Sequence, residues 1–103
     1  MTSPNAIPAG PELDKAVHRE IMGTDFVPFT FQPSTNIAHA WLVVEKMREK
    51  GCGATVTVNP RGTYCAWFNT TYNQRHVAAG DTAPEAICRA ALAAVRAQAK
   101  ERT

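Results

Sequence analysis

The sequence predicts an α+β layered sandwich, in which helices pack on a three-stranded antiparallel sheet, in the order helix, helix, strand, strand, strand, helix. Two observations carry this prediction. Apolar residues recur about every 3.6 positions in the segments 11–22, 35–50 and 82–100, whereas a period of two appears at 54–58. Because an amphipathic helix and a sheet each bury an apolar face, these elements are expected to stack in layers around one core.

We expect residues 1–9 to form a flexible tail and residues 10–103 to form a single domain. Pro11 fits the first turn of a helix, where its missing N–H leaves no bond unmade, and Gly23 follows as a stop signal. This pattern predicts a first helix over Pro11–Met22. Its apolar stripe consists of Leu13, Val17, Ile21 and Met22.

The segment 24–33 holds two prolines among its aromatic residues, and residues that precede proline prefer an extended backbone. We therefore expect an extended connector that lays phenylalanine rings onto the domain. The next helix is predicted over 35–50, with Ser34 or Thr35 as its N-cap and Gly51 at its end. Its expected buried stripe consists of Ile37, Trp41, Val44 and Met47.

Three strands are expected after the second helix. Ala54–Val58 alternates between apolar residues and threonine, which is typical of a one-faced strand, and a turn follows at 59–62. The strand at 63–69 is apolar on both faces, with Cys65 and Trp67 on one and Tyr64, Ala66 and Phe68 on the other. Such a strand is usually central and covered on both sides. A turn at 70–73 and a short antiparallel strand at 74–79 complete the sheet.

The last helix has the strongest local signal. Thr82 and Glu85 have the spacing of a capping box, in which each side chain bonds a backbone amide of the first turn. Many alanines follow up to about Lys100, and they let a helix approach a sheet closely at good helix propensity.

Composition excludes several classes of protein. With 103 residues the chain forms one domain, and its net charge of +2 gives no strong phosphate-binding footprint. It shows no membrane-spanning apolar run and no signal sequence, so we expect a cytoplasmic protein without membrane contact. Its three cysteines have no CxxC spacing, which favours reduced thiols. A zinc site from Cys52, Cys65, Cys88 and His76 would match no known spacing, so no metal is expected.

Three stretches together resemble the phage ABA sandwich domain family. They are Pro11–Val17 with Ile21–Gly23, then Ser34–Trp41 with Val43–Lys50, and finally Asp81–Leu92. The resemblance implies an α/β sandwich from a phage or prophage, acting in the cytoplasm of a bacterial host. The type-one Thoeris anti-defence proteins are similar to this family, and they are oligomers that sequester cyclic ADP-ribose-type signals. The resemblance therefore implies a cyclic nucleotide or a cyclic ADP-ribose-type molecule as ligand, and a homo-oligomer. None of those proteins' binding residues is matched to a position here.

No catalytic constellation stands out. A nucleophile needs a base within reach and a group that orients the base, but His18 and His39 read as solvated or half-buried helix residues. The carboxylates read as helix-dipole or surface residues, and no phosphate-cradling glycine loop is present. We expect a non-enzymatic protein with no cofactor.

A ligand site is instead expected around the sheet. Tyr64 and Phe68 share a strand face and could stack a base, while the turns and the third strand supply donors. The candidate ligand-binding residues are Arg61, Tyr64, Phe68, Asn69, Arg75 and His76. The alternative is that both rings are covered by the connector 24–33 or by a second subunit.

Two other functions stay open. The element order is also that of the double-stranded-RNA-binding domain, but that domain carries lysines where this chain has the acidic Asp81–Glu85, so nucleic acid is an unlikely partner. An apolar strand face would equally suit an inhibitor that binds a host protein. The basic residues of the last helix are read as a solvated face; they are Arg89, Arg96, Lys100 and Arg102.

Overall fold

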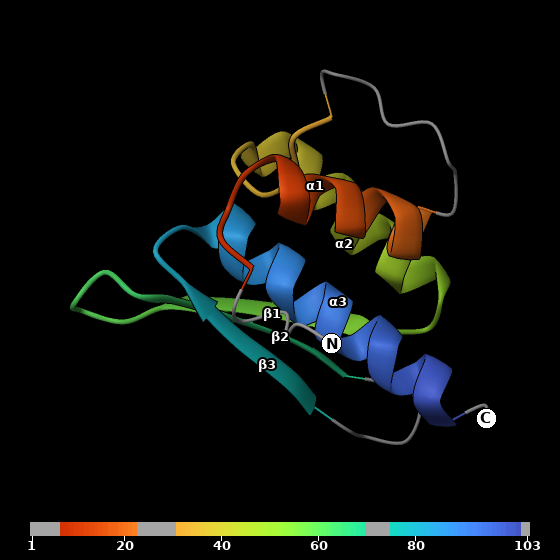
Figure 1. The fold of residues 1–103 in the computed structure, drawn as a ribbon. Helices are drawn as coiled ribbons and strands as arrows, with labels where there is room; N and C mark the ends of the chain where they lie inside the picture. Colours follow the sequence, from red (N-terminus) through yellow and green to blue (C-terminus); the bar gives the residue numbers. More distant parts are fainter. Residues whose placement is uncertain (1–6, 23–30, 70–74, 102–103) are drawn as a thin grey trace.

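The computed structural model describes residues 7–22, 31–69 and 75–101, and it confirms the predicted order of elements (Figure 1). A three-stranded antiparallel sheet in the order β1-β2-β3 carries the helices. The helices are α1 (Pro11–Val17), its π-helical continuation η2 (His18–Met22), α2 (Ile37–Glu49) and α3 (Ala83–Glu101). The strands are β1 (Gly53–Val58), β2 (Tyr64–Asn69) and β3 (Arg75–Gly80). The predicted turn at 70–73, and most of the connector 24–33, fall outside the described residues.

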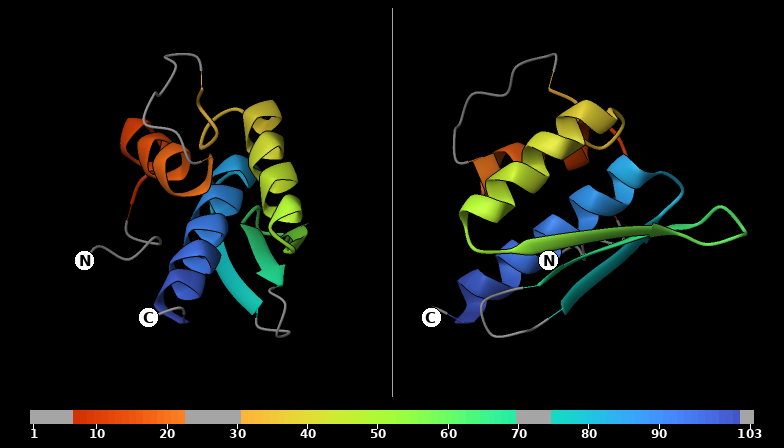
Figure 2. Two further views of the ribbon diagram at one scale, coloured as in Figure 1. Left: turned by 90° about the vertical axis from the view of Figure 1, so that its right-hand side faces the viewer. Right: turned by 180° about the vertical axis from the view of Figure 1, so that it is seen from behind.

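All the described helices lie on the same face of the sheet (Figures 1 and 2). α3 packs directly on β3 and β2, α1 contacts α3, and α2 contacts both α3 and the edge strand β1. The expectation that the middle strand is covered on both faces is therefore wrong for the part of the chain that the structure describes. We call the face without helices the open face.

The strand register decides which residues share each face, because directly paired residues project to the same side. Val56 pairs with Ala66, and Ala66 with Ala78, so these three face the helices. The side chains of the open face are Thr55, Thr57, Cys65, Trp67, Asn69, Arg75, Val77 and Ala79.

α3 holds the centre of the core. Small residues such as Ala90 and Ala94 are fully buried on it, which lets the helix approach β2 and β3 closely. Its capping box is confirmed: the N–H of Glu85 donates to Thr82 Oγ1 at 3.3 Å, and Glu85 Oε1 accepts from the N–H of Asp81 at 3.4 Å. Leu13, Val17 and Ile21 of the first helix pack into the same core, as their spacing predicts.

α2 is rotated relative to the prediction. Val44 and Met47 are buried as expected, but Ile37 and Trp41 are each 54% exposed. Ala40 and Val43 are buried in the core instead. The buried face of α2 is therefore rotated about the helix axis relative to the predicted stripe.

The N-cap of α2 also differs from the prediction. Asn36 caps the helix, with Oδ1 accepting from the N–H groups of Ala38 and His39. Ser34 is instead fully buried: its N–H donates to Asp14 Oδ1 at 2.8 Å, and its Oγ accepts from the N–H of Gly10. Asp14, expected as a surface residue, is therefore a buried acceptor that ties α1 to the chain before α2.

Two basic residues of α3 do not form the solvated face that the sequence suggested. Arg89 pairs with Glu85 at 2.7 Å, and its side chain is only 14% exposed. Arg96 makes a two-pronged contact with the carboxylate of Glu20, at 2.9 Å for each bond. This contact raises the pKa of the Arg96 guanidinium further above its ordinary value. Both arginines thus fasten the N-terminal part of the chain to α3.

Candidate functional site

A cleft of about 460 Å³ opens between α2 and the edge strand β1. Helix and strand supply one wall each. Its lining residues are Trp41, Val44, Glu45 and Arg48 from α2, and Cys52, Gly53, Ala54 and Val56 from the following segment and β1.

The turn after α2 creates this arrangement. Gly51 has φ +88°, a left-handed conformation that glycine adopts without strain. Its N–H bonds the carbonyl of Arg48 and the N–H of Cys52 bonds that of Met47, which together end the helix in a Schellman motif. The chain therefore reverses into β1 directly beneath α2. The N-terminal end of α2 lies farther from the sheet than its C-terminal end, so the backbones of α2 and β1 diverge toward the β1–β2 hairpin (Figure 2).

The two ends of the cleft differ in chemistry. Toward the N-terminus of α2, the lining contains the exposed indole of Trp41, and β1 contributes the partly exposed Val56, so the walls are aromatic and aliphatic. Toward the C-terminus of α2, Arg48 pairs with Glu45 at 2.9 Å, and their side chains are 73% and 46% exposed. An exposed pair of this kind contributes only about 0–1 kcal/mol. The Arg48 guanidinium can therefore exchange its partner for an anionic ligand at little cost.

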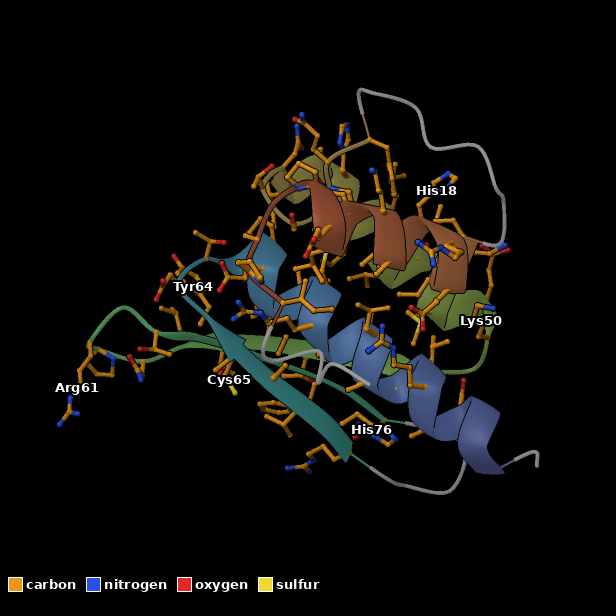
Figure 3. All side chains as sticks on the ribbon, viewed as in Figure 1. His18, Lys50, Arg61, Tyr64, Cys65 and His76 are labelled. Carbon is orange, nitrogen blue, oxygen red and sulfur yellow. The ribbon has the colours of Figure 1, made fainter. Side chains whose placement is uncertain are left out.

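The residues predicted from the sequence to bind a ligand do not come together. Arg61 lies exposed at the tip of the β1–β2 hairpin, far from the other candidates (Figure 3). The hairpin holds it there firmly, because Asn59 Oδ1 accepts from the N–H groups of Arg61 and Thr63. Arg61 thus has no described partner with which to form a pocket.

The remaining candidates divide between the two faces of the sheet. Phe68 is 1% exposed under α3, so its ring offers no surface for stacking a base. Among the described residues, α3 packs on this face of β2 and β3. Tyr64 is half-buried against the core, and His76 lies on the same face with Nε2 buried and without a hydrogen-bond partner among the described residues. Asn69 and Arg75 lie on the open face.

The open face holds a second cluster that sequence reasoning missed. The guanidinium carbon of Arg75 lies 5.2 Å from the centre of the Trp67 ring, a cation–π contact. Trp67 was expected to be covered, yet it is only half-buried. The cleft between α2 and β1 is lined by two elements and has a defined volume, so we take it as the candidate site.

The described residues show no arrangement suited to catalysis. His39 stacks on Phe31, and its Nδ1 accepts from the N–H of Gln32 at 2.9 Å, so it has a structural role. His18, expected to be solvated or half-buried, is 6% exposed and meets the same phenylalanine edge-on. Burial raises the pKa of the Cys88 thiol, which keeps it protonated and unreactive.

Within the described ranges, no three histidine, cysteine or acidic side chains are grouped so that they could hold a metal ion. None of the described helices combines the length and apolarity that crossing a bilayer requires.

A sequence signal for the cleft existed. Trp41 and Ile37 were assigned to a core stripe, but α2 carries apolar residues over a sector wider than one packing face needs: Ile37, Ala40, Trp41, Val43, Val44 and Met47. The edge strand β1, which lies next to that sector, also carries the valines Val56 and Val58. The excess apolar width of the helix therefore indicated that part of its apolar surface lies outside the core, but not which residues do.

Comparison with known proteins identifies relatives of this fold. The family model described as "Phage ABA sandwich domain" matches residues 11–92, which include every lining residue of the cleft. A crystal structure of a phage protein from Bacillus cereus ATCC 14579 is similar, with a TM-score of 0.65 and 22% identity over 90% of this chain and 91% of that chain. At this identity the likeness shows the fold alone. No curated protein gave a significant match.

Proposed function

The chain belongs to the phage ABA sandwich domain family, and we propose that it is a non-enzymatic binding protein that sequesters a small nucleotide-type ligand between α2 and β1. The observation that carries the proposal is the presence of an exposed indole, Trp41, and an exposed guanidinium, Arg48, along one cleft. The resemblance to type-one Thoeris anti-defence proteins favours a host immune signal, such as a cyclic ADP-ribose-type molecule or a cyclic nucleotide.

The size and chemistry of the cleft support this class of ligand. Its volume of about 460 Å³ is in the range of small-molecule sites. Stacking of a base on an aromatic side chain contributes about 1–3 kcal/mol. Arginine binds phosphate through parallel hydrogen bonds, and Arg48 lies two helical turns, about 10 Å along the helix axis, from Trp41.

The lining residues favour holding a ligand over converting it. Glu45 and Arg48 are the ionisable side chains of the lining besides Cys52, and they pair with each other. Cys52 is 2% exposed, and its Sγ lies 3.5 Å from the amide nitrogen of Gln98. Hydrolysis or group transfer needs a positioned general base or nucleophile, and no lining residue is placed for that work.

Tryptophan fluorescence tests the proposal directly, because the chain has only two tryptophans, Trp41 and Trp67. The variant Trp67→Phe leaves Trp41 as the single reporter in the cleft. We expect saturable quenching by a cyclic ADP-ribose isomer or a cyclic nucleotide, and a rise in Tm as ligand binds the folded state. Arg48→Gln should weaken binding about tenfold. Arg61→Gln, at the hairpin tip, is the matched control and should leave binding unchanged.

The same experiment can overturn the proposal. Unchanged Trp41 emission and unchanged Tm across cyclic ADP-ribose isomers, cyclic mononucleotides and cyclic oligonucleotides at millimolar concentration would exclude nucleotide sequestration. Equal weakening by Arg48→Gln and Arg61→Gln would show that binding follows general charge rather than the cleft.

A protein-binding inhibitor is the second candidate, because Ile37 and Val58, each more than half exposed, extend the apolar surface beyond the ligand-sized cleft. It predicts that one host protein is captured from a lysate and released by Ile37→Asp. Double-stranded RNA remains the weakest candidate, because Asp81 and Glu85 stand at the start of α3, where that domain has lysines.

A further inference from the structure

The open face of the sheet departs from the pattern of a sheet surface that faces water. A one-sided antiparallel sheet normally alternates apolar residues toward the core with polar residues toward the solvent. On β2 and β3 the open positions are instead Cys65 paired with Ala79, and Trp67 paired with Val77. Val77 is 48% exposed. These four side chains form one apolar block in the middle of a face on which no described helix packs.

The charges of this face restrict what can cover it. Arg75 is its only charged side chain among the described residues, and the guanidinium already lies over the Trp67 ring. β1 adds the hydroxyls of Thr55 and Thr57. A nucleic acid would need several cations here, and an acidic or basic protein would find little complementary charge. The face therefore fits an uncharged apolar partner with a few hydroxyl groups.

A second copy of the same face has that chemistry. We propose that two chains associate through their open faces, so that the sheets pack against each other with the helices outside. Sheets that pack in this way lie about 10 Å apart, with their inner side chains interdigitated. If a two-fold axis lies between the two sheets and runs perpendicular to the strands, Trp67, near the middle of β2, packs against the apolar block of the other copy. The same axis moves the two Arg75 side chains to opposite ends of the interface, which separates their like charges.

The area of the open face determines how strongly the two chains are expected to associate. Three six-residue strands present roughly 300 Å² of sheet, given the usual strand spacing and rise. The β1–β2 hairpin extends the sheet beyond the helical layer, which adds contact area (Figures 1 and 2). A stable interface commonly buries about 800 Å² on each partner. We therefore expect a reversible dimer whose population rises with concentration, not an obligate one.

Two valines on opposite faces of the sheet provide a matched pair of variants. Val77 is 48% exposed on the open face, and Val58 is 55% exposed on the face that carries the helices. Sedimentation velocity from micromolar to millimolar concentration should show the wild-type chain shifting from monomer to dimer. Val77→Glu should weaken the dimer roughly tenfold or more, because association would bury an unpaired carboxylate. Val58→Glu should behave as the wild type.

The possible outcomes distinguish a dimer through the open face from a nucleic-acid partner, from a dimer through the α2–β1 side, and from the proposed ligand site. A wild-type chain that stays monomeric at millimolar concentration overturns it, and a single-stranded oligonucleotide that then binds would identify the other occupant. Loss of the dimer in Val58→Glu but not in Val77→Glu would place the interface at the α2–β1 side and also overturn it. Thermal unfolding of both variants checks that each is folded. Trp41 quenching by nucleotide is measured separately, so either proposal can fail without the other.

Discussion

The guanidinium of Arg89 donates two hydrogen bonds, of 3.0 and 3.1 Å, to the backbone carbonyl of Ile7, which lies 82 positions earlier in the chain. The same guanidinium donates to the carbonyl of Ala79 at 3.0 Å and pairs with Glu85. One side chain therefore joins the N-terminal segment, the end of β3 and the first turns of α3. The sequence predicted a flexible tail over residues 1–9, whereas Ile7 is half-buried and fastened by this contact.

Arg89→Ala should destabilise the fold by about 3 kcal/mol, because it leaves the largely buried Glu85 carboxylate without its charged partner and the carbonyls of Ile7 and Ala79 without this donor. Urea denaturation measures the change. Arg48→Ala is the control, since the Arg48 side chain is 73% exposed and its pair with Glu45 should contribute less than about 1 kcal/mol. Similar losses in both variants would contradict the anchoring role of Arg89.

Gly80 ends β3 where the first turn of α3 crosses close to the strand. A Cβ at this position would lie 3.0 Å from the backbone nitrogen of Ala86 and 3.0 Å from Glu85 Oε1. Gly80→Ala should therefore cost about 1–3 kcal/mol of stability, because the helix must shift away from the sheet. At Gly53 an added Cβ meets nothing within 4 Å. Gly53→Ala should change the free energy of unfolding by less than about 0.5 kcal/mol, and equal effects would contradict the argument.

Local signals predicted most of the fold. The change of period from helix to strand, the turn at Asn59–Gly62 and the capping box of Thr82 and Glu85 depend on neighbours in sequence, and the structure confirms each. The N-cap of α2 was predicted wrongly because it depends on contacts that are distant in sequence. Ser34 satisfies its hydrogen bonds with Gly10 and Asp14, which are distant in sequence, so Asn36 takes the capping role.

The candidate site could not be predicted from local patterns. Whether Trp41 packs in the core or lines a cleft depends on how α2 is rotated against α3, and nothing in the heptad-like spacing of the helix fixes that rotation. The face containing Phe68 was correctly identified as apolar, but sequence alone does not say which of two apolar faces a helix covers. α3 covers that face and leaves Trp67 on the open one.

Stability should fall in alkaline solution because of Cys88. Burial raises the pKa of this thiol above its ordinary value of 9.0. In the folded chain the thiol therefore stays protonated at a pH where the unfolded chain has already lost the proton. Its contribution to stability is complete below about pH 9 and is lost as the pH rises above that value, by at most about 1.4 kcal/mol per pH unit.

Urea denaturation at a series of pH values across this range tests the effect. The free energy of unfolding should decline with pH more steeply in the wild type than in Cys88→Ala, whatever constant loss the substitution itself causes. Cys65→Ala, which removes a half-buried thiol from the open face, is the matched control variant. If the free energy of unfolding declined equally with pH in all three proteins, the buried thiol would not cause the loss of stability in alkaline solution.

The three cysteines should react in a fixed order with an alkylating reagent. Cys65 is half-buried on the open face, whereas Cys52, which follows α2, and Cys88, on α3, are buried in the core. Alkylation requires an accessible thiolate, so native protein at low concentration should gain one adduct quickly, at Cys65, and the other two only on unfolding. Mass spectrometry of digested samples locates each adduct, and Cys65→Ser should abolish the fast phase. Raising the protein concentration should slow the reaction at Cys65 if a second chain covers that face. Fast modification of Cys52 or Cys88 in the folded chain would contradict their burial in the core.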